Sequence, residues 1–496
     1  RSTAFLSDSH GRAQTIHAEL ALDAEGKFLA VRLQGHGNLG AYITGVAPGP
    51  LSLHTGKNLA SVYRTPLLGV DIKTVLTNTT LMGAYRGAGR PEANYYMERL
   101  IDRAADEMGI NRLTLRKRNF IKPSQLPFAA ASGVTYDSGD FAGVFNTALE
   151  ISDHANFARR KKESKKNGKL RGIGISCYIE ACGIAPSNIA GALGARAGLF
   201  EAGEIRVHPT GSVTVFTGSH SHGQGHETTF AQVVAERLGL PIDKVDIVHG
   251  DTSKILFGMG TYGSRSIAVG GTAIVKALDK IVAKGKKIAA HLLEASETDI
   301  EYDKGVFKVA GTDRQKAFGE VAFAAYVPHN YPLDKLEPGL NENAFYDPTN
   351  FTFPAGSYVC EVEVDKDTGA TQIVSFVAVD DCGNIINPMI VEGQVHGGLT
   401  QGIGQALTEG TRYDSEGQLL SGAFMDYAIP RAGDVPSYKI DTRETPCTHN
   451  PLGVKGCGEA GAIGAPAAVI NAITDALGVK DIPMPATAQT VWKTMQ

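Results

Sequence analysis

Three stretches of the chain alternate apolar and polar residues with the two-residue period of a β-strand. They lie at residues 17–33, 204–217 and 358–379, and each is interrupted by a turn signal such as Asp23 to Gly26 in the first stretch. This pattern predicts three hairpins. Hairpins favour antiparallel sheets over the strand–helix alternation of a Rossmann fold.

Apolar residues at helical spacing follow a glycine-rich stretch at residues 81–91, which reads L-M-G-A-Y-R-G-A-G-R-P. With Pro91 at the first turn and Gly109 at the stop, the spacing predicts a helix over residues 91–108. Three further glycine-rich stretches lead into apolar runs, at residues 218–230, 258–271 and 393–410. Together the hairpins and helices predict an α+β chain.

A basic, polar run at residues 159–171 reads R-R-K-K-E-S-K-K-N-G-K-L-R. Charge runs of this kind are usually solvated, so we interpret it as a linker. We therefore expect two domains, residues 1–170 and 171–496, and two domains suit a chain of 496 residues.

The composition is that of a globular protein, with 43% apolar and 20% charged residues. A net charge of -4 argues against a nucleic-acid surface, which would be basic. We expect no membrane span, because no apolar run reaches about 18 residues. The chain opens R-S-T-A-F-L without an initiator Met or a signal peptide, so we expect an internal fragment or a chain cut from a longer one.

The six cysteines contain no C-x-x-C pair, which indicates reduced thiols in a cytosolic protein. The chain therefore offers no iron–sulfur cluster of its own. The histidines of the glycine-rich stretches (His220, His222, His226 and His396) lack zinc-site spacing, so we expect no protein-ligated metal.

The glycine-rich stretches suit an anionic ligand, because a helix N-terminus presents unpaired N–H donors. Arg86 and Arg90 add guanidinium groups, and the G-S-R-S segment adds Ser264, Arg265 and Ser266. Three glutamines add amides that suit the edge of a flat heterocycle: Gln224, Gln394 and Gln401. One large ligand with phosphates and polar rings explains this set, although glycines that pack tightly in a core are an alternative. G-A-Y-R-G-A-G does not match the Rossmann fingerprint, which disfavours a nicotinamide-dependent dehydrogenase.

Glu459 lies among five glycines in residues 451–466, P-L-G-V-K-G-C-G-E-A-G-A-I-G-A-P. Glycine lets the backbone approach a ligand closely, so one interpretation is a general base aimed at that ligand. The alternative is that Glu459 caps the helix predicted over residues 467–477.

Taken together, G-A-Y-R-G-A-G-R-P, G-Q-G-H-E-T, G-S-R-S, Q-G-I-G-Q-A-L-T-E and G-V-K-G-C-G-E-A-G resemble the molybdenum hydroxylase family. This family contains xanthine dehydrogenases, aldehyde oxidoreductases and aerobic carbon monoxide dehydrogenases. The resemblance covers nearly the whole chain, as the C-terminal part of the family's large subunit. It implies two elongated mixed α/β domains that bind molybdopterin cytosine dinucleotide through glycine-rich loop-to-helix contacts.

The resemblance places Glu459 at the family's catalytic glutamate, with molybdenum held by the pterin and not by a protein side chain. It assigns cofactor contacts to Arg86, Gly87, Ala88, Gly223, Gln224, Gly225, His226, Thr228, Gly263, Ser264, Arg265, Ser266, Gln394, Gln401, Lys455, Gly456 and Gly458.

Two departures qualify the resemblance. Carbon monoxide dehydrogenases of the family carry a copper-binding cysteine at the position of Gly87, so a molybdenum–copper carbon monoxide oxidase is disfavoured. Family large subunits also extend further at the N-terminus. We expect the part that precedes this chain, with its own glycine-rich loop, to come from a further chain or fragment.

The implied activity is hydroxylation of an aromatic N-heterocycle or an aldehyde, with water as the oxygen source and Glu459 as the base. Alternatives are a scaffold subunit without catalysis, or a carbon monoxide dehydrogenase-like oxidoreductase lacking the copper cysteine. Small Ala88 mildly favours a roomy site. The implied partners are a small [2Fe–2S] subunit and an FAD subunit, in a cytoplasmic dimer of heteromers, or a periplasmic one if the complex is exported.

Overall fold

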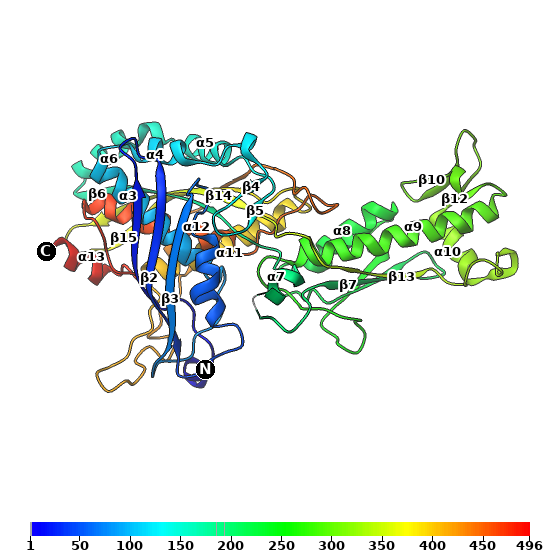
Figure 1. The fold of residues 1–496 in the computed structure, drawn as a ribbon, viewed down its shortest axis with the longest axis horizontal. Helices are drawn as coiled ribbons and strands as arrows, with labels where there is room; N and C mark the ends of the chain where they lie inside the picture. Colours follow the sequence, from blue (N-terminus) through cyan, green and yellow to red (C-terminus); the bar gives the residue numbers. More distant parts are fainter. Residues whose placement is uncertain (1, 185, 193) are drawn as a thin grey trace.

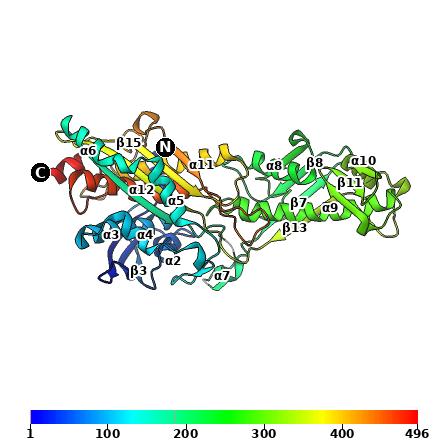
Figure 2. The same ribbon diagram turned by 90° about the horizontal axis from the view of Figure 1, so that it is seen from above.

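The structure is a computed structural model that describes residues 2–184, 186–192 and 194–496. The molecule is elongated, with a larger lobe that holds both termini and a smaller lobe that projects from it (Figures 1 and 2). The smaller lobe lies in sequence between β6 (Lys169–Ile179) and β14 (Ala355–Asp365), which pair with each other in the larger lobe. It is therefore an insertion between two neighbouring strands.

The larger lobe contains two main sheets. One has the order β16-β15-β14-β6 and adds β15 (Thr371–Asp381) and β16 (Lys439–Thr442). The other has the order β1-β2-β3, with β1 (Gln14–Leu22), β2 (Phe28–Gly40) and β3 (Leu67–Leu76). A short ribbon pairs β4 (Phe128–Ala129) with β5 (Thr135–Tyr136).

Several helices of the larger lobe pack against these sheets (Figure 1). The helices of this lobe are α1 (Ser2–Ser7), α2 (Thr55–Asn58), α3 (Arg90–Met108), α4 (Arg112–Asn119), α5 (Phe141–Ile151), α6 (Phe157–Lys166), α11 (Pro388–Leu407), α12 (Ala460–Leu477) and α13 (Ala488–Met495).

The smaller lobe has a hydrophobic core of its own, drawn from residues between Ile205 and Ala344. Its main sheet has the order β13-β7-β8-β9. The strands of the smaller lobe are β7 (Glu201–Val207), β8 (Val213–Thr217), β9 (Val245–Val248), β10 (Ile300–Asp303), β11 (Val306–Val309), β12 (Gln315–Ala317) and β13 (Asn341–Tyr346). Its helices are α8 (His226–Leu238), α9 (Thr272–Leu292) and α10 (Phe318–Tyr326), with α7 (Ser187–Ala192) near the junction.

All three predicted hairpins are confirmed, because β1–β2, β7–β8 and β14–β15 pair antiparallel. Each of these sheets also contains a parallel pair that the alternation did not predict: β2–β3, β8–β9 and β15–β16. The helix predicted over residues 91–108 is α3, and it ends at Gly109 as expected. The fold is therefore a mixed α/β arrangement of several sheets.

The domain boundary at residue 170 stays a prediction. The interpretation of the basic run as a solvated linker, on which that boundary was based, is wrong. The basic run interpreted as a linker forms most of α6 and the start of β6. Its arginines make ion pairs with acids on β14: Arg160 and Arg171 with Glu361, and Arg171 also with Glu363. The run is therefore paired with an acidic strand, a partner about 190 residues away that local composition does not reveal.

Backbone-to-backbone packing places α12 between a sheet and α11. On β6, a Cβ at Gly172 or Gly174 would lie 2.0 Å from a carbonyl oxygen of α12. On α11, a Cβ at Gly398 would lie 2.9 Å from the Cα of Gly461. Glycine is used here because the elements approach more closely than any side chain allows.

Among the described residues, α12 is the one helix long and apolar enough to cross a membrane by length and composition, so the chain contains an apolar run that the sequence analysis did not count. The packing just described encloses 89% of it inside the protein. It is thus a core helix, and it begins at residue 460, seven residues before the predicted start.

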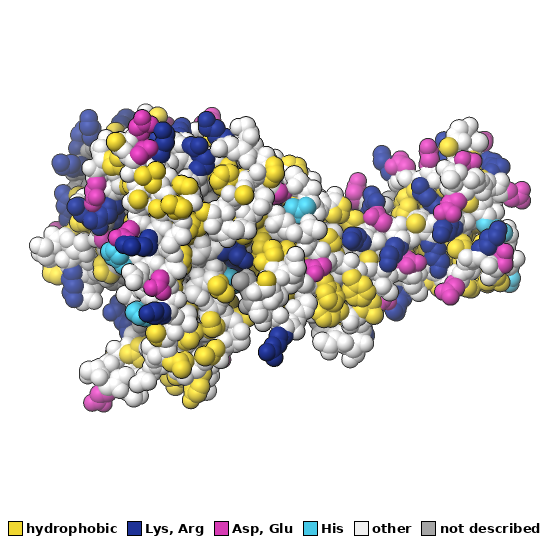
Figure 3. Space-filling model, in the orientation of Figure 1, with side chains coloured by type: hydrophobic (Ala, Val, Ile, Leu, Met, Phe, Trp, Pro, Cys, Tyr) yellow, Lys and Arg dark blue, Asp and Glu magenta, His cyan; other side chains and the backbone are white. Residues whose placement is uncertain are grey.

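Charged side chains crowd the outer ends of both lobes on the face shown in Figure 3, whereas apolar and uncharged atoms dominate the waist between them. The waist is also where the chain enters and leaves the smaller lobe. A ligand site at this junction would be bounded by both lobes.

We predict that Gly461→Ala destabilises the protein by about 1–3 kcal/mol, because its Cβ would lie 2.3 Å from the backbone nitrogen of Leu399. The midpoint of thermal unfolding measures the effect. Gly393→Ala is the matched control, since Gly393 is an exposed position of α11 with nothing within 4 Å of its Cβ position. There we expect an unchanged or slightly higher midpoint. Equal midpoints for both variants would contradict the close packing of α11 on α12.

Candidate active site

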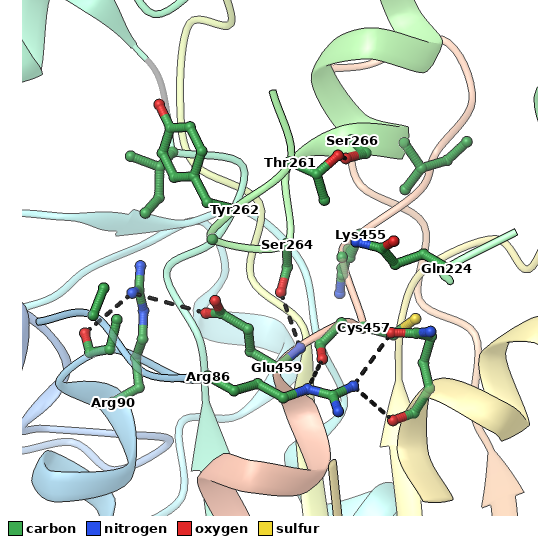
Figure 4. A pocket seen from close by; sticks show the side chains of 18 of the residues that line it. Arg86, Arg90, Gln224, Thr261, Tyr262, Ser264, Ser266, Lys455, Cys457 and Glu459 are labelled. Atoms are coloured by element: carbon green, nitrogen blue, oxygen red, sulfur yellow. Dashed lines mark hydrogen bonds and ion pairs between the residues drawn. The ribbon is translucent and has the colours of Figure 1, made fainter. Parts of the chain in front are cut away.

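A cavity of about 1310 Å³ lies at the waist and is lined by residues of both lobes. It is larger than a typical small-molecule pocket, so it has room for a large ligand together with a second, smaller one. Segments far apart in sequence converge on it: residues 84–90, 222–230, 259–267, 382–401 and 454–459. Figure 4 shows that side chains from these segments point toward one space.

Glu459 lies directly before α12, at the N-cap position, but its side chain makes no capping hydrogen bond. Its Oε2 atom is buried and has no hydrogen-bond partner, while the side chain as a whole is 14% exposed. The backbone N–H of Glu459 donates to Ser264 Oγ over 3.2 Å. The carboxylate is therefore free to act on a ligand in the cavity, which decides against the helix-cap alternative.

Arg86 holds the segment that carries Glu459. Its Nε donates to the carbonyl of Gly458 over 2.5 Å, and its Nη1 to Gln401 Oε1 over 3.0 Å. Its Nη2 donates to the carbonyl of Gln394 over 2.9 Å. One guanidinium thus ties the segment before α12 to α11, a geometry that needs the planar fork of arginine (Figure 4).

Arg90 supplies the positive charge that faces Glu459, with Nη1 4.0 Å from Glu459 Oε2. Its side chain is 3% exposed, and Nη2 donates to the carbonyl of Ala181 over 2.6 Å. The nearby His54 is neutral at pH 7 and adds no second positive charge, because burial and the Arg90 cation lower the pKa of His54 to about 3. Arg90 was recognised in the sequence as a donor, but the structure adds its role opposite Glu459.

The loop before α3 has a backbone that only glycine adopts easily. Gly87 has φ 100° and Gly89 has φ 92°. A Cβ at Gly87 would lie 2.4 Å from Pro91 Cγ, and one at Gly89 would lie 2.5 Å from the carbonyl oxygen of Pro50. In this conformation position 87 has no space for a thiol-bearing side chain.

Two loops of the smaller lobe complete the wall. Gly223 and Gly225 precede α8 with φ 105° and 72°, and Gly260 has φ 79°. A Cβ at Gly223 or Gly260 would meet nothing within 4 Å, so the backbone here borders open space. Thr261 and Ser266 share a hydrogen bond of 2.8 Å. Burial lowers the pKa of His226, the first residue of α8, to about 4, so its imidazole is neutral.

Most of the residues assigned to the cofactor line this cavity. They are Arg86, Ala88, Gly223, Gln224, His226, Gly263, Ser264, Ser266, Gln394, Gln401, Lys455, Gly456, Gly458 and Glu459. Four assigned residues are not part of the lining: Gly87, Gly225, Thr228 and Arg265. Thr229, the neighbour of Thr228, lies in the lining instead. The individual roles stay predictions.

Two cations assigned to the cofactor are already paired within the protein. Arg265 is fully buried, and its Nη1 lies 2.8 Å from Glu201 Oε1. Lys455 Nζ lies 3.0 Å from Asp381 Oδ2, and both side chains are buried. The geometry does not support Arg265 as a fork for phosphate, because its guanidinium anchors the G-S-R-S loop to β7.

The stretch at residues 393–410 is not a loop, contrary to expectation, since most of it lies inside α11. Gln394 and Gln401 therefore reach the cavity from a helix. The glycines reflect the close approach of α12, and this packing is the alternative that the sequence had left open. At the other three stretches, positive φ values and cavity-lining backbone favour the ligand interpretation.

The sequence analysis overlooked three residues of the site. Cys382 and Cys457 line the cavity, and Glu180 lies behind it, hydrogen bonded to Ser264. A signal for Glu180 was present, because one acid follows the apolar run G-I-G-I-S-C-Y-I of a strand. The cysteines carried no such signal.

Comparison with known proteins identifies the sequence family. Residues 147–436 and residues 1–120 match profiles of the molybdopterin cofactor-binding domain. The whole chain is 39% identical to the carbon monoxide dehydrogenase large chain of Hydrogenophaga pseudoflava, of which it covers 62%.

Two solved structures are similar over almost the whole chain. The Cu,Mo-CO dehydrogenase has a TM-score of 0.93 at 38% identity over 99% of this chain and 63% of its own. Quinoline 2-oxidoreductase from Pseudomonas putida 86 has a TM-score of 0.93 at 36% identity over 100% of this chain and 63% of its own. The chain thus spans about three fifths of the length of the relatives it matches.

We predict that Arg86→Lys loosens the segment before α12, because lysine cannot make the same three directed hydrogen bonds. Hydrogen bonds to a charged group contribute about 1.5–3 kcal/mol each, so amide hydrogen exchange at residues 456–459 should quicken tenfold or more. Arg237→Lys is the control, because Arg237 is a half-exposed residue that pairs with Asp279. Unchanged amide hydrogen exchange at residues 456–459 in Arg86→Lys would show that Arg86 does not hold this segment in place.

Proposed function

The chain belongs to the molybdopterin cofactor-binding family that includes the large chains of molybdenum hydroxylases, and from this premise we propose that it is the catalytic part of such an enzyme. The observation that carries the proposal is that Glu459 lines a cavity built from glycine-rich loops and makes no capping hydrogen bond to the helix that follows it. A carboxylate in this setting can act as a general base.

The residues of the cavity fit a phosphate-bearing cofactor. Among the described lining residues, Glu459 is the one acid, whereas Lys57, Arg86, Arg90 and Lys455 are cationic. The backbone before α8 borders open space and ends at a helix N-terminus, which suits a phosphate group. We propose that Gln224, Thr261, Ser264 and Ser266 add polar contacts, and that Gln394 and Gln401 contact the pterin side.

The bound cofactor would supply the oxidising metal centre, and water would be the source of the oxygen that is transferred. The protein supplies the rest. Glu459 accepts a proton at its carboxylate, and Arg86 fixes the loop that presents it. The Arg90 guanidinium lies 4.0 Å from Glu459 Oε2 and places a positive charge beside this carboxyl group.

We propose that the substrate is an aromatic N-heterocycle or an aldehyde. Apolar residues from both lobes, such as Leu53, Ile184, Ile189, Tyr262 and Phe351, form a wall suited to a flat, weakly polar molecule. The similarity to quinoline 2-oxidoreductase supports the heterocycle. The similarity to Cu,Mo-CO dehydrogenase keeps carbon monoxide as a second candidate. Gly87 disfavours it, because a thiol at that position would require a different loop conformation.

The remaining parts of the proposal concern assembly. We propose the cytosine dinucleotide form of the cofactor, a [2Fe–2S] subunit and an FAD subunit as electron acceptors, and a cytoplasmic dimer of heteromers. The six cysteines are free thiols, five of them buried, which supports electron transfer through a partner. The portion of the relatives that this chain does not span would complete the molybdenum subunit.

We predict that Glu459→Gln lowers kcat with an artificial electron acceptor by about 10²–10⁴-fold, because the amide cannot accept a proton. Molybdenum and pterin content of the purified complex should be unchanged. Glu107→Gln is the control, since Glu107 is a half-exposed residue near the end of α3. Normal turnover by Glu459→Gln would leave the scaffold-subunit alternative standing.

The substrate class has its own test. We expect quinoline-like heterocycles or aromatic aldehydes to reduce the acceptor, and carbon monoxide to leave it oxidised, when molybdenum is present and copper is absent by metal analysis. Turnover of carbon monoxide would show that position 87 does not decide the chemistry.

A further inference from the structure

Glu180 is a second carboxyl group next to the base, and no part of the mechanism above uses it. It follows the last residue of β6, and its side chain is completely buried. Its backbone N–H donates to the carbonyl of Pro354 over 2.9 Å, which fixes it at the point where the chain leaves the sheet for the smaller lobe. Burial of an acid in this way is costly unless it is paired or neutral.

A single hydroxyl group connects Glu180 to Glu459. Ser264 Oγ donates to Glu180 Oε2 over 3.3 Å and accepts the backbone N–H of Glu459 over 3.2 Å. Glu180 Oε1 and Glu459 Oε2 are both buried and without a conventional donor. The two side chains are close enough to hydrogen bond with each other. Two carboxyl groups can form such a bond only if one of them keeps its proton.

The surrounding charges also require one neutral acid. Arg90 is the cation that faces the pair, and its guanidinium is shared with the carbonyls of Ala181 and Ala88. On the other side lies Cys182, whose pKa is raised by burial and by the Glu180 carboxyl, so the thiol is neutral. Arg86 also acts on the charge of Glu459. Arg90 is the cation that acts on Glu180, and its influence there is smaller than those of burial and of Glu459, so a charged Glu180 would be poorly compensated.

Burial raises the pKa of Glu180 well above its ordinary value of 4.5, and the negative charge of Glu459 raises it further. The Arg90 cation and the Ser264 hydroxyl act in the opposite direction but are smaller influences. The acid that stays neutral is therefore the deeper one, Glu180, and the acid at the cavity wall stays available as the base.

We propose that Glu180 is a positioning residue, which keeps its proton at neutral pH and donates a hydrogen bond to the carboxylate of Glu459. The inference rests on the proposed role of Glu459 as the base. The hydrogen bond orients the Glu459 carboxylate toward the cavity and keeps one of its oxygens occupied. The other oxygen is then directed at the substrate side.

The first test needs neither cofactor nor turnover. In infrared spectra of the intact protein at pH 7, the protonated-carboxyl band of Glu180 should disappear in Glu180→Gln and remain in the control Glu107→Gln. Difference spectra are needed, because the buried Asp380 has a pKa raised by burial to about 7 and contributes a band of its own. A band that survives in Glu180→Gln would overturn the proposal.

The second test uses the pH dependence of stability. A carboxyl group whose pKa is raised in the folded state contributes stability below its unfolded pKa, and that contribution is lost as the pH rises through the folded pKa. Above about pH 4.5 the wild-type unfolding equilibrium should therefore shift toward unfolding by up to about tenfold per pH unit more than that of Glu180→Gln. Parallel pH profiles for the two proteins would overturn the proposal.

The third test measures the positioning role in the loaded complex. Glu180→Ala should lower kcat about 100-fold with little change in KM, and Glu180→Gln should recover most of the loss, because its amide can donate the same hydrogen bond. Wild-type kcat in Glu180→Ala would overturn the positioning role. If Glu180 holds its proton but Glu459→Gln turns over normally, the proposed function falls and the positioning role with it. An ionised Glu180 at pH 7 would overturn only the present inference.

Discussion

Close backbone packing of α12 against α11 and β6 is the constraint from which the geometry of the site follows. The contacts at Gly398, Gly461 and Gly174 join backbone to backbone, so no flexible side chain can absorb a shift. Because Glu459 immediately precedes α12, its position is fixed by the position of the helix. The proposed base is therefore preorganised, because its location is set by the core of the fold.

Buried charges extend this rigidity to the loops. Arg265 pairs with Glu201 and Lys455 pairs with Asp381, all four with little or no exposed side-chain surface. Each pair joins a cavity loop to a strand or to its end, so removal of one partner would leave a buried charge uncompensated and release the loop. The cations left to face the ligand, Arg86 and Arg90, are also hydrogen bonded to backbone carbonyls on one side. The site is therefore positively biased without containing a mobile cation.

Local signals in the sequence predicted the elements, but not how they meet. The hairpins and α3 followed from periodicity, proline and glycine, which act over a few residues. The parallel strand pairs, the acidic partners of Arg160 and Arg171, and the pairing of Arg265 depend on residues brought together by the fold. The family resemblance singled out Glu459 as the proposed base, whereas Glu180 acquires its significance only from its position behind Ser264. A residue type alone does not show whether an arginine binds a ligand or anchors a loop.

The two uses of glycine in this chain illustrate what a closer sequence analysis can recover. In α11 the buried glycines Gly398 and Gly402 are four residues apart, and Gly461 and Ala465 on α12 repeat that spacing with small side chains. A period of four places small residues on one face of a helix, which indicates a packing surface. The loop at residues 218–226, G-S-H-S-H-G-Q-G-H, shows no such period, and Gly223 and Gly225 in it have positive φ. Both stretches are rich in glycine, so the number of glycines does not distinguish them. The spacing of the glycines does distinguish the helix that supports the site from the loops that surround it.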